Sequence, residues 1–175
     1  MKALKNISLL LVLAIFSFSC DELDELTEED INTGFNTTLN VNVGAMDPLT
    51  YTQTETIDLA NNPDIQNALD LIQDIRINSI TAQVSNYNGA AGIMVTNASF
   101  QFDNINVSVA DIDLQSYDDN NTMIEISDSS QLNAIANALQ ADNEIIVTVS
   151  GTVDGSPVNF DVIVTLDVTV TIDVL

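Results

Sequence analysis

Apolar and polar residues alternate through most of the chain after residue 34. Between Phe35 and Val43, apolar or threonine positions alternate with asparagine and threonine. The same period of two recurs further on, at residues 51–59, 77–87, 92–102, 105–109, 123–126, 145–152 and 158–172. A period of two with one polar face is typical of antiparallel strands that bury the other face. The pattern therefore predicts about eight strands.

Two stretches have helical spacing instead. The first begins at Asn62-Pro63, an N-cap followed by the proline that helix starts favour. Its apolar residues recur every three or four positions, at Ile65, Ala68, Leu69, Ile72 and Ile75. The second follows the capping residues Ser127–Ser130, with Leu132, Ile135, Ala136 and Leu139 in phase. Two short amphipathic helices are therefore predicted.

The two halves of the chain share one order of elements: strand, helix, strand, tight turn, strand. Asn88-Gly89 and Asp154-Gly155 supply the turns, and both dipeptides are strong hairpin signals. The helices are too few and too short to cover a parallel sheet. The sequence thus predicts a mainly β fold, an antiparallel two-sheet sandwich of about eight strands with two short helices and an internal strand-helix-hairpin duplication.

The beginning of the chain has the pattern of a secretory signal. Lys2 and Lys5 precede an apolar run over residues 7–18, and small residues precede Cys20. A positive start, a short apolar core and small residues before the cleavage point define such a signal. A membrane-spanning helix needs roughly 20 apolar residues, which this run does not supply.

Ser17-Phe18-Ser19-Cys20 resembles a bacterial lipobox, the cleavage site of the lipoprotein signal peptidase. The family's usual pattern has leucine where Ser17 stands. The resemblance implies that residues 1–19 are removed and that Cys20 becomes a lipidated N-terminus carrying fatty acyl chains such as palmitate. Acyl chains of this kind give stable membrane attachment. The alternative is ordinary secretion, with cleavage near Ser19 and an unmodified Cys20.

Acidic residues follow Cys20, in the run Asp21-Glu22-Leu23-Asp24-Glu25 and again at residues 28–30. Such a run repels itself and buries little apolar surface, so residues 20–33 are predicted to be a solvated tether ahead of a sandwich domain at 34–175. The run also resembles the acidic export signal of surface lipoproteins in Gram-negative bacteria. That resemblance implies a surface-exposed position on the cell outer membrane; the alternative is an anchored domain that faces the periplasm.

Charge excludes one class of partner. The chain has 3 Lys and Arg residues against 26 Asp and Glu residues. Lys2 and Lys5 lie in the predicted signal, so the mature chain has Arg76 as its one cation and a side-chain charge of −25. Nucleic-acid binding depends on cations that neutralise phosphates. No nucleic-acid partner is expected.

Missing residue types limit the chemistry. The chain has no His and no Trp, and the mature chain has no Lys. Ser-His-Asp and Cys-His pairs, Schiff-base lysines and histidine zinc sites are therefore absent. We expect a non-catalytic binding or adhesion module for a protein or glycan ligand, with no cofactor. The alternatives are a structural or accessory subunit of an envelope assembly and, more remotely, a glycosidase acting through two carboxylates.

One acidic stretch is a candidate calcium loop. Asp111, Asp113, Asp118 and Asp119 stand together, next to Asn120 and Asn121. Calcium takes six to eight oxygen ligands, which carboxylates and amides supply. The spacing does not match an EF-hand, because the loop lacks the required glycine. An exposed polar loop between strands is the alternative.

The three tyrosines and Arg76 are further candidate functional residues. Tyr51, Tyr87 and Tyr117 would form a sugar-stacking platform if they converged, but in separate elements they are more typical of core or rim positions. Arg76 is expected at the end of the first helix, where a cation suits the helix dipole, paired with Asp74 or Glu55.

The high charge of the domain predicts a salt-dependent stability. Repulsion among the acidic residues opposes the compact state, and dissolved salt screens it. The melting temperature of the mature protein should rise with sodium chloride up to a few hundred millimolar. Differential scanning calorimetry at increasing salt measures this, and a flat response would contradict it.

Overall fold

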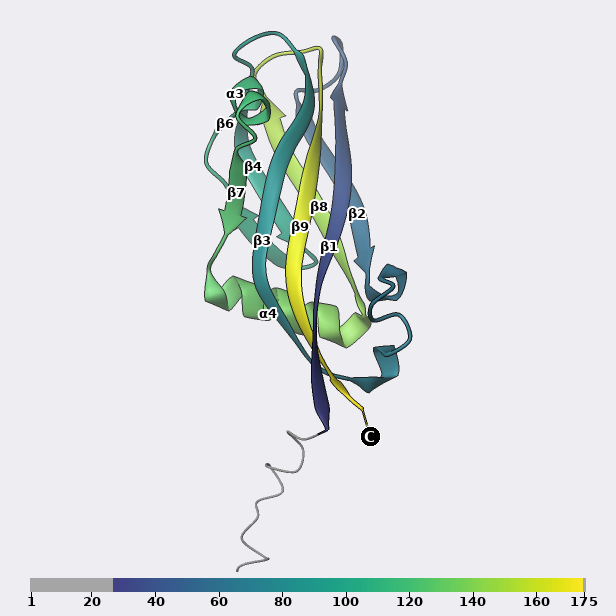
Figure 1. Cartoon of the computed structure of the whole chain (residues 1–175). Helices are drawn as coiled ribbons and strands as arrows, with labels where there is room; N and C mark the ends of the chain where they lie inside the picture. The colour runs from purple at the N-terminus through teal and green to yellow at the C-terminus, as the bar shows by residue number, and fades with distance from the viewer. Residues whose placement is uncertain (1–26, 175) are drawn as a thin grey trace, which may run out of the picture.

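Two antiparallel sheets packed face to face form the structure, a computed structural model that describes residues 27–174 (Figure 1). Sheet A has the order β1-β9-β3-β7, and sheet B has the order β2-β8-β4-β5 with β6 beside β4. The predicted mainly β, two-sheet antiparallel sandwich is confirmed. The strands are β1 (Glu28–Val43), β2 (Thr50–Asp58), β3 (Ile72–Gly89), β4 (Met94–Phe102), β5 (Ile105–Ser108), β6 (Ile112–Asp113), β7 (Met123–Ile126), β8 (Glu144–Val153) and β9 (Val158–Asp173).

The core lies between the sheets and is organised around β9. This strand pairs with β1 on one side and with β3 on the other. Its alternate residues are all buried, as the sequence pattern predicts: Val158, Phe160, Val162, Val164, Leu166, Val168, Val170 and Ile172. From sheet B, Tyr51 meets Phe160 edge to face at 5.6 Å between ring centroids. Burial raises the pKa of Tyr51, which is a core residue.

The second predicted helix is confirmed as α4 (Ser129–Asp142), which closes one end of the sandwich (Figure 1). Ile135, Ala136 and Leu139 are its buried residues. Asp128 is the N-cap and accepts hydrogen bonds from the backbone N–H groups of Ser130 and Gln131, each at 3.0 Å. Hydrogen bonds from the Ser130 hydroxyl and from these N–H groups lower the pKa of Asp128.

The helix predicted from Asn62 does not form. Residues 59–71 contain only two short 3-10 turns, η1 (Leu59–Asn61) and η2 (Leu69–Leu71), and β3 already begins at Ile72. Asn62 donates to the Thr33 hydroxyl at 2.8 Å, and Thr33 donates to Asp64 at 3.0 Å. The N–H of Asp64 in turn donates to the Asn62 side chain at 2.9 Å. This closed ring of hydrogen bonds fixes the segment against β1.

The predicted hairpins are also wrong. Asn88 and Gly89 are the last residues of β3 and still pair with β9, and the turn follows at residues 90–93. The strands on either side of this turn, β3 and β4, lie in different sheets, and so do β8 and β9 on either side of Asp154-Gly155. Both turns are arches that carry the chain across the core. Asp154 joins them, because its side chain accepts from the N–H of Met94 at 2.9 Å and its own N–H donates to the Met94 carbonyl at 3.1 Å. With one predicted helix missing and neither predicted hairpin formed, the strand-helix-hairpin duplication is not present in residues 27–174.

Strand β1 begins earlier than predicted. Glu28 to Thr33 pair with Asp173 to Val168, although these residues belong to the range 20–33 expected to be a tether. The long β9 offers them a partner strand, which outweighs their mutual repulsion. The signal at 1–19, Cys20 and the rest of the tether to residue 26 lie outside the described residues.

Replacing Asn62 with alanine tests the hydrogen-bond ring. Asn62 is only 7% exposed, so its loss removes the donor to the Thr33 hydroxyl and leaves the N–H of Asp64 without its acceptor. We expect a loss of about 1–3 kcal/mol in the free energy of unfolding, measured by urea denaturation. Asn61→Ala, at the exposed neighbouring position, is the matched control and should change stability by less than about 0.5 kcal/mol. Equal effects of the two variants would contradict the assigned role.

Candidate binding surfaces

The four aspartates of the candidate calcium loop lie around β6 and a short helix, α3 (Leu114–Asp119), where the sequence predicted only a loop. Asp113 is the N-cap of α3 and accepts from the N–H of Ser116 at 3.0 Å. Asp118 accepts from the N–H of Tyr87 at 3.1 Å. Asp111 and Asp119 are exposed. Within residues 27–174, no group of three or more acidic side chains is arranged to hold a metal ion.

The three tyrosines do not form a platform. Tyr51 is buried between the sheets, against Phe160. Tyr87 is near the end of β3, where its hydroxyl donates to the Ala90 carbonyl, and Tyr117 is on α3. Burial, together with the nearby carboxylates of Asp113 and Asp154, raises the pKa of Tyr87. Both partly buried tyrosines pack against the core, as rim residues do.

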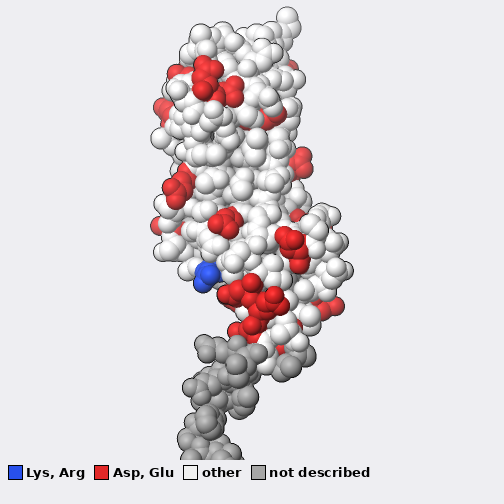
Figure 2. All heavy atoms as spheres, viewed as in Figure 1, with Lys and Arg blue, Asp and Glu red and all other residues white. Residues whose placement is uncertain are grey.

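Arg76 lies on β3, not at a helix end. It donates to the side chains of Asn78 at 3.3 Å and Thr169 at 3.4 Å. Neither Asp74 nor Glu55 pairs with it among the hydrogen bonds of residues 27–174. Figure 2 shows acidic side chains over the face formed by β1, β9 and β3, gathered most densely near the end where the described chain begins. Arg76 is therefore one cation in an acidic surface.

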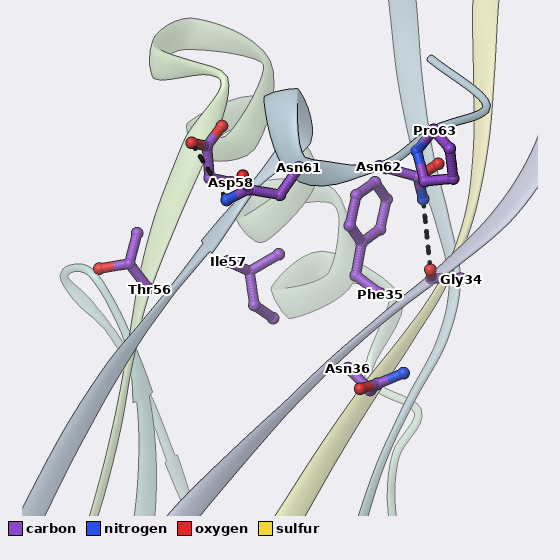
Figure 3. Close-up of a pocket in the computed structure, with 9 residues that line it drawn as sticks. All are labelled: Gly34, Phe35, Asn36, Thr56, Ile57, Asp58, Asn61, Asn62 and Pro63. Atoms are coloured by element: carbon purple, nitrogen blue, oxygen red, sulfur yellow. Dashed lines mark hydrogen bonds between the residues drawn. The ribbon is translucent and has the colours of Figure 1, made fainter. Parts of the chain in front are cut away.

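A cleft opens between the edges of the two sheets (Figure 3). It measures about 290 Å³ and is bounded by β1 at residues 34–36, by β2 at residues 56–58 and by the turn at residues 61–63. Phe35 and Ile57 point toward one another across its floor. Asp58 lies at its rim and accepts from the N–H of Ala60 at 2.8 Å. The cleft thus has the largely buried side chains of Phe35 and Ile57 at its base, 6% and 4% exposed, and a polar, partly acidic rim.

A second hollow lies at the opposite end of the sandwich from α4. It measures about 470 Å³ and is lined by residues of both arches and of the ends of β1 and β9. Asn42, Asn159 and Asn88 form one row across β1, β9 and β3. Their amides offer donors and acceptors without charge. We call this the distal groove.

The loop from β1 to β2 lies at the same end and exposes apolar side chains. Met46 is 100% exposed and Leu49 is 40% exposed. Asp47 folds this loop by accepting from the N–H of Gly44 at 2.8 Å. The distal end therefore combines uncharged amides and exposed apolar side chains with nearby carboxylates, among them Asp47 and Asp154.

A third hollow, of about 480 Å³, lies near α4 and is acidic. Asp103, Asp142 and Glu144 line it with neighbouring polar residues. Asp103 has a backbone role, because it accepts from the N–H of Ile146 at 3.0 Å.

Sequence reasoning missed the cleft and the distal groove. The alternating asparagines of β1 were visible as a polar face, but nothing local shows that Asn42 shares a row with Asn88 and Asn159. Phe35 and Ile57 were predicted only as inward-facing strand residues. Their meeting depends on β1 and β2 being edge strands of opposite sheets.

Comparison with known proteins adds little to this description. No family model matches the chain, and no curated protein matches it. Among solved structures, one titled Desmodium yellow mottle tymovirus has 11% identity and a TM-score of 0.40, covering 85% of this chain and 84% of that one. The decameric BFDV capsid protein has 10% identity and a TM-score of 0.33, covering 82% of this chain and 97% of its own. None of the helices in residues 27–174 has the length and apolar character needed to cross a bilayer.

Variants of the acidic residues test whether they serve the backbone or a metal. Asp113→Ala removes the cap of α3 and Asp118→Ala removes the acceptor of the Tyr87 N–H, so each should lower the free energy of unfolding by about 1 kcal/mol. Asp119→Ala is the control and should leave stability unchanged. Because Asp113 and Asp118 already accept backbone hydrogen bonds, we expect calcium to leave the melting temperature of the wild type unaltered. A saturable rise that Asp119→Ala abolishes would instead support the calcium loop.

Proposed function

We propose that the chain is a lipoprotein anchored in the cell outer membrane through acyl chains on Cys20, with a surface-exposed, non-catalytic sandwich that serves binding or adhesion. One structural observation supports this proposal above others. The described chain enters the sandwich at one end, whereas the distal groove and the exposed Met46 and Leu49 lie at the other (Figure 1). An anchor at Cys20 would direct that end, with its amides and exposed apolar side chains, away from the membrane.

The character of the hollows favours binding over catalysis. The distal groove and the cleft are lined mainly by amides, hydroxyls and apolar groups. The carboxylates of Asp58, Asp103, Asp113 and Asp118 accept backbone hydrogen bonds. Protein and glycan ligands are both recognised by sites with a few well-placed polar groups beside apolar surface.

A periplasm-facing structural or accessory subunit is the second candidate. The acidic residues that follow Cys20 suit either orientation, because a solvated spacer does not require surface export. Both candidates share the anchor, and they differ only in the side of the membrane that the sandwich faces.

Mass spectrometry of the protein from a Gram-negative host tests the anchor. We expect a mature chain that starts at an acylated Cys20. Cys20→Ser should abolish acylation and release the protein from the membrane fraction. Ser17→Leu, which restores the usual lipobox residue, is the matched control and should keep the lipid. An unmodified Cys20 thiol, or a chain that still begins at Met1, would reject the proposal.

Protease treatment of intact cells distinguishes the two orientations. Loss of the sandwich from protease-treated intact cells, with periplasmic markers preserved, is expected for surface display. Protection of the sandwich until the outer membrane is opened would favour the periplasmic alternative.

A further inference from the structure

The edge of β1 that faces away from β9 presents unpaired backbone groups. The Thr27 carbonyl accepts from the N–H of Val174 at 2.8 Å, so these two residues form a hydrogen-bonded pair. Because such pairs alternate along an antiparallel ladder, the odd-numbered residues of β1 direct their backbone N–H and C=O groups toward β9. Even-numbered residues face the free edge, and the Gly34 carbonyl there accepts from Asn62 at 3.4 Å. The register is continuous from Glu28 to Val43, which extends this alternation along the whole strand.

Side chains of the same domain hydrogen-bond to the free edge at two points, and the backbone groups between these points have no partner among residues 27–174. Asn62 covers Gly34, and at the other end Asp47 binds both backbone groups of Gly44, at 2.8 Å and 3.1 Å. Four residues between these points direct their N–H and C=O groups outward: Asn36, Thr38, Asn40 and Asn42. All four are exposed, and their backbone groups on this edge have no partner among residues 27–174.

None of the usual protections of an edge strand is present over this stretch. Natural edges are short, or are interrupted by bulges, prolines or charged residues. The opposite edges, β5 and β7, have only four residues each. By contrast, residues 31–43 of β1 contain no charged residue, no proline and no register shift. This open stretch is therefore suited to accept another strand.

The cleft described above lies beside the same edge. Gly34 and Asn36 of β1 form one of its walls, and Phe35 and Ile57 lie at its base. A strand added to β1 would extend sheet A past the cleft, and its alternate side chains would point to the side of the sheet that faces the cleft. An apolar side chain of the added strand would cover the floor.

Charge indicates the partner. The chain has a formal net charge of −23, and on β2 Asp58 lines the cleft, with Glu55 three residues before it on the same strand. A second copy of the chain would bring an equal negative charge to the edge. An extended segment that carries Lys or Arg would instead be attracted to it.

We propose that the free edge of β1 between Gly34 and Gly44 binds an extended, basic segment of a partner protein as an added strand of sheet A, with an apolar side chain in the cleft of Phe35 and Ile57. The proposal rests on the binding role inferred above and gives that role a partner class. Backbone hydrogen bonds would supply affinity, and the cleft and the surrounding acidic residues would supply selectivity.

Peptide binding to the full-length protein, purified in mild detergent whatever its state at Cys20, tests the site. The probe is a fluorescent nine-residue peptide of alternating Lys and Val, followed by fluorescence anisotropy. Thr38→Pro removes an outward N–H at a position where an edge strand tolerates proline. We expect about tenfold weaker binding, from the loss of at least one hydrogen bond and the obstruction by the ring. Thr38→Ala keeps the N–H and should bind as the wild type does.

Two further peptides separate strand addition from simple charge attraction. A version with proline in place of three valines keeps the charge but cannot form a strand, and a version with Glu in place of Lys keeps the strand pattern but reverses the charge. Both should bind at least about tenfold more weakly than the probe. These peptide comparisons use the wild type and decide the question even if Thr38→Pro fails to fold, as judged by circular dichroism.

Several results would overturn the proposal: no binding of the probe to folded protein, equal binding of the proline peptide, or equal affinities for the two folded Thr38 variants. Self-association in light scattering that Thr38→Pro abolishes would assign the edge to a second copy and also reject a basic partner. The outcome is separate from that of the anchor, because probe binding is measured on purified protein whose state at Cys20 is read independently by mass spectrometry.

Discussion

The pairing of β9 with β1 and β3 is the interaction on which the rest of the structure depends. The last strand of the chain lies between an early strand and a middle one, and it pairs with β1 over its whole length. Its buried residues, from Val158 to Ile172, form one wall of the core. The sequence has a single cysteine and so no second one with which to form a disulfide within the chain; strand pairing and packing across the core must therefore hold the sandwich together. Sheet A is therefore incomplete until the C-terminal strand is in place.

This central position of β9 leaves β1 at an edge. Sheet B ends at β2 on the same side, so the sandwich is open there, and the turn at residues 59–64 covers only part of the opening. The ring of Asn62, Thr33 and Asp64 holds the turn against β1 and limits the cleft to its present extent. The cleft and the unpaired edge thus have a single topological cause.

Much of this architecture could be predicted from the sequence, and the failures have specific reasons. The alternation of buried and exposed residues located the long strands, and the capping residues with the spacing of Leu132, Ile135 and Leu139 located α4. Ile72 and Ile75 imitated a helix because a register shift between Ile72 and Asp74 lets residues three apart both contribute to the core. The Asn-Gly and Asp-Gly turns were visible, but a turn signal does not say whether the next strand joins the same sheet. The cleft, the distal groove and the roles of Asp113 and Asp118 depend on contacts distant in sequence, which no local pattern reports.

The extreme charge and the unprotected edge can be understood together. Edge strands are usually defended by local devices, chiefly lysine, proline or a bulge, and β1 has none of these between Ile31 and Val43. A net charge of −23 opposes the approach of a second copy from a distance of about one Debye length, ~8 Å at physiological ionic strength. That repulsion acts on every molecule with a net negative charge, including a second copy of the chain, and does not act on a basic molecule. The net charge of the whole chain can therefore protect the edge against self-association while its hydrogen-bonding groups stay accessible. A lysine on the strand itself would instead obstruct a second copy and a basic partner strand alike.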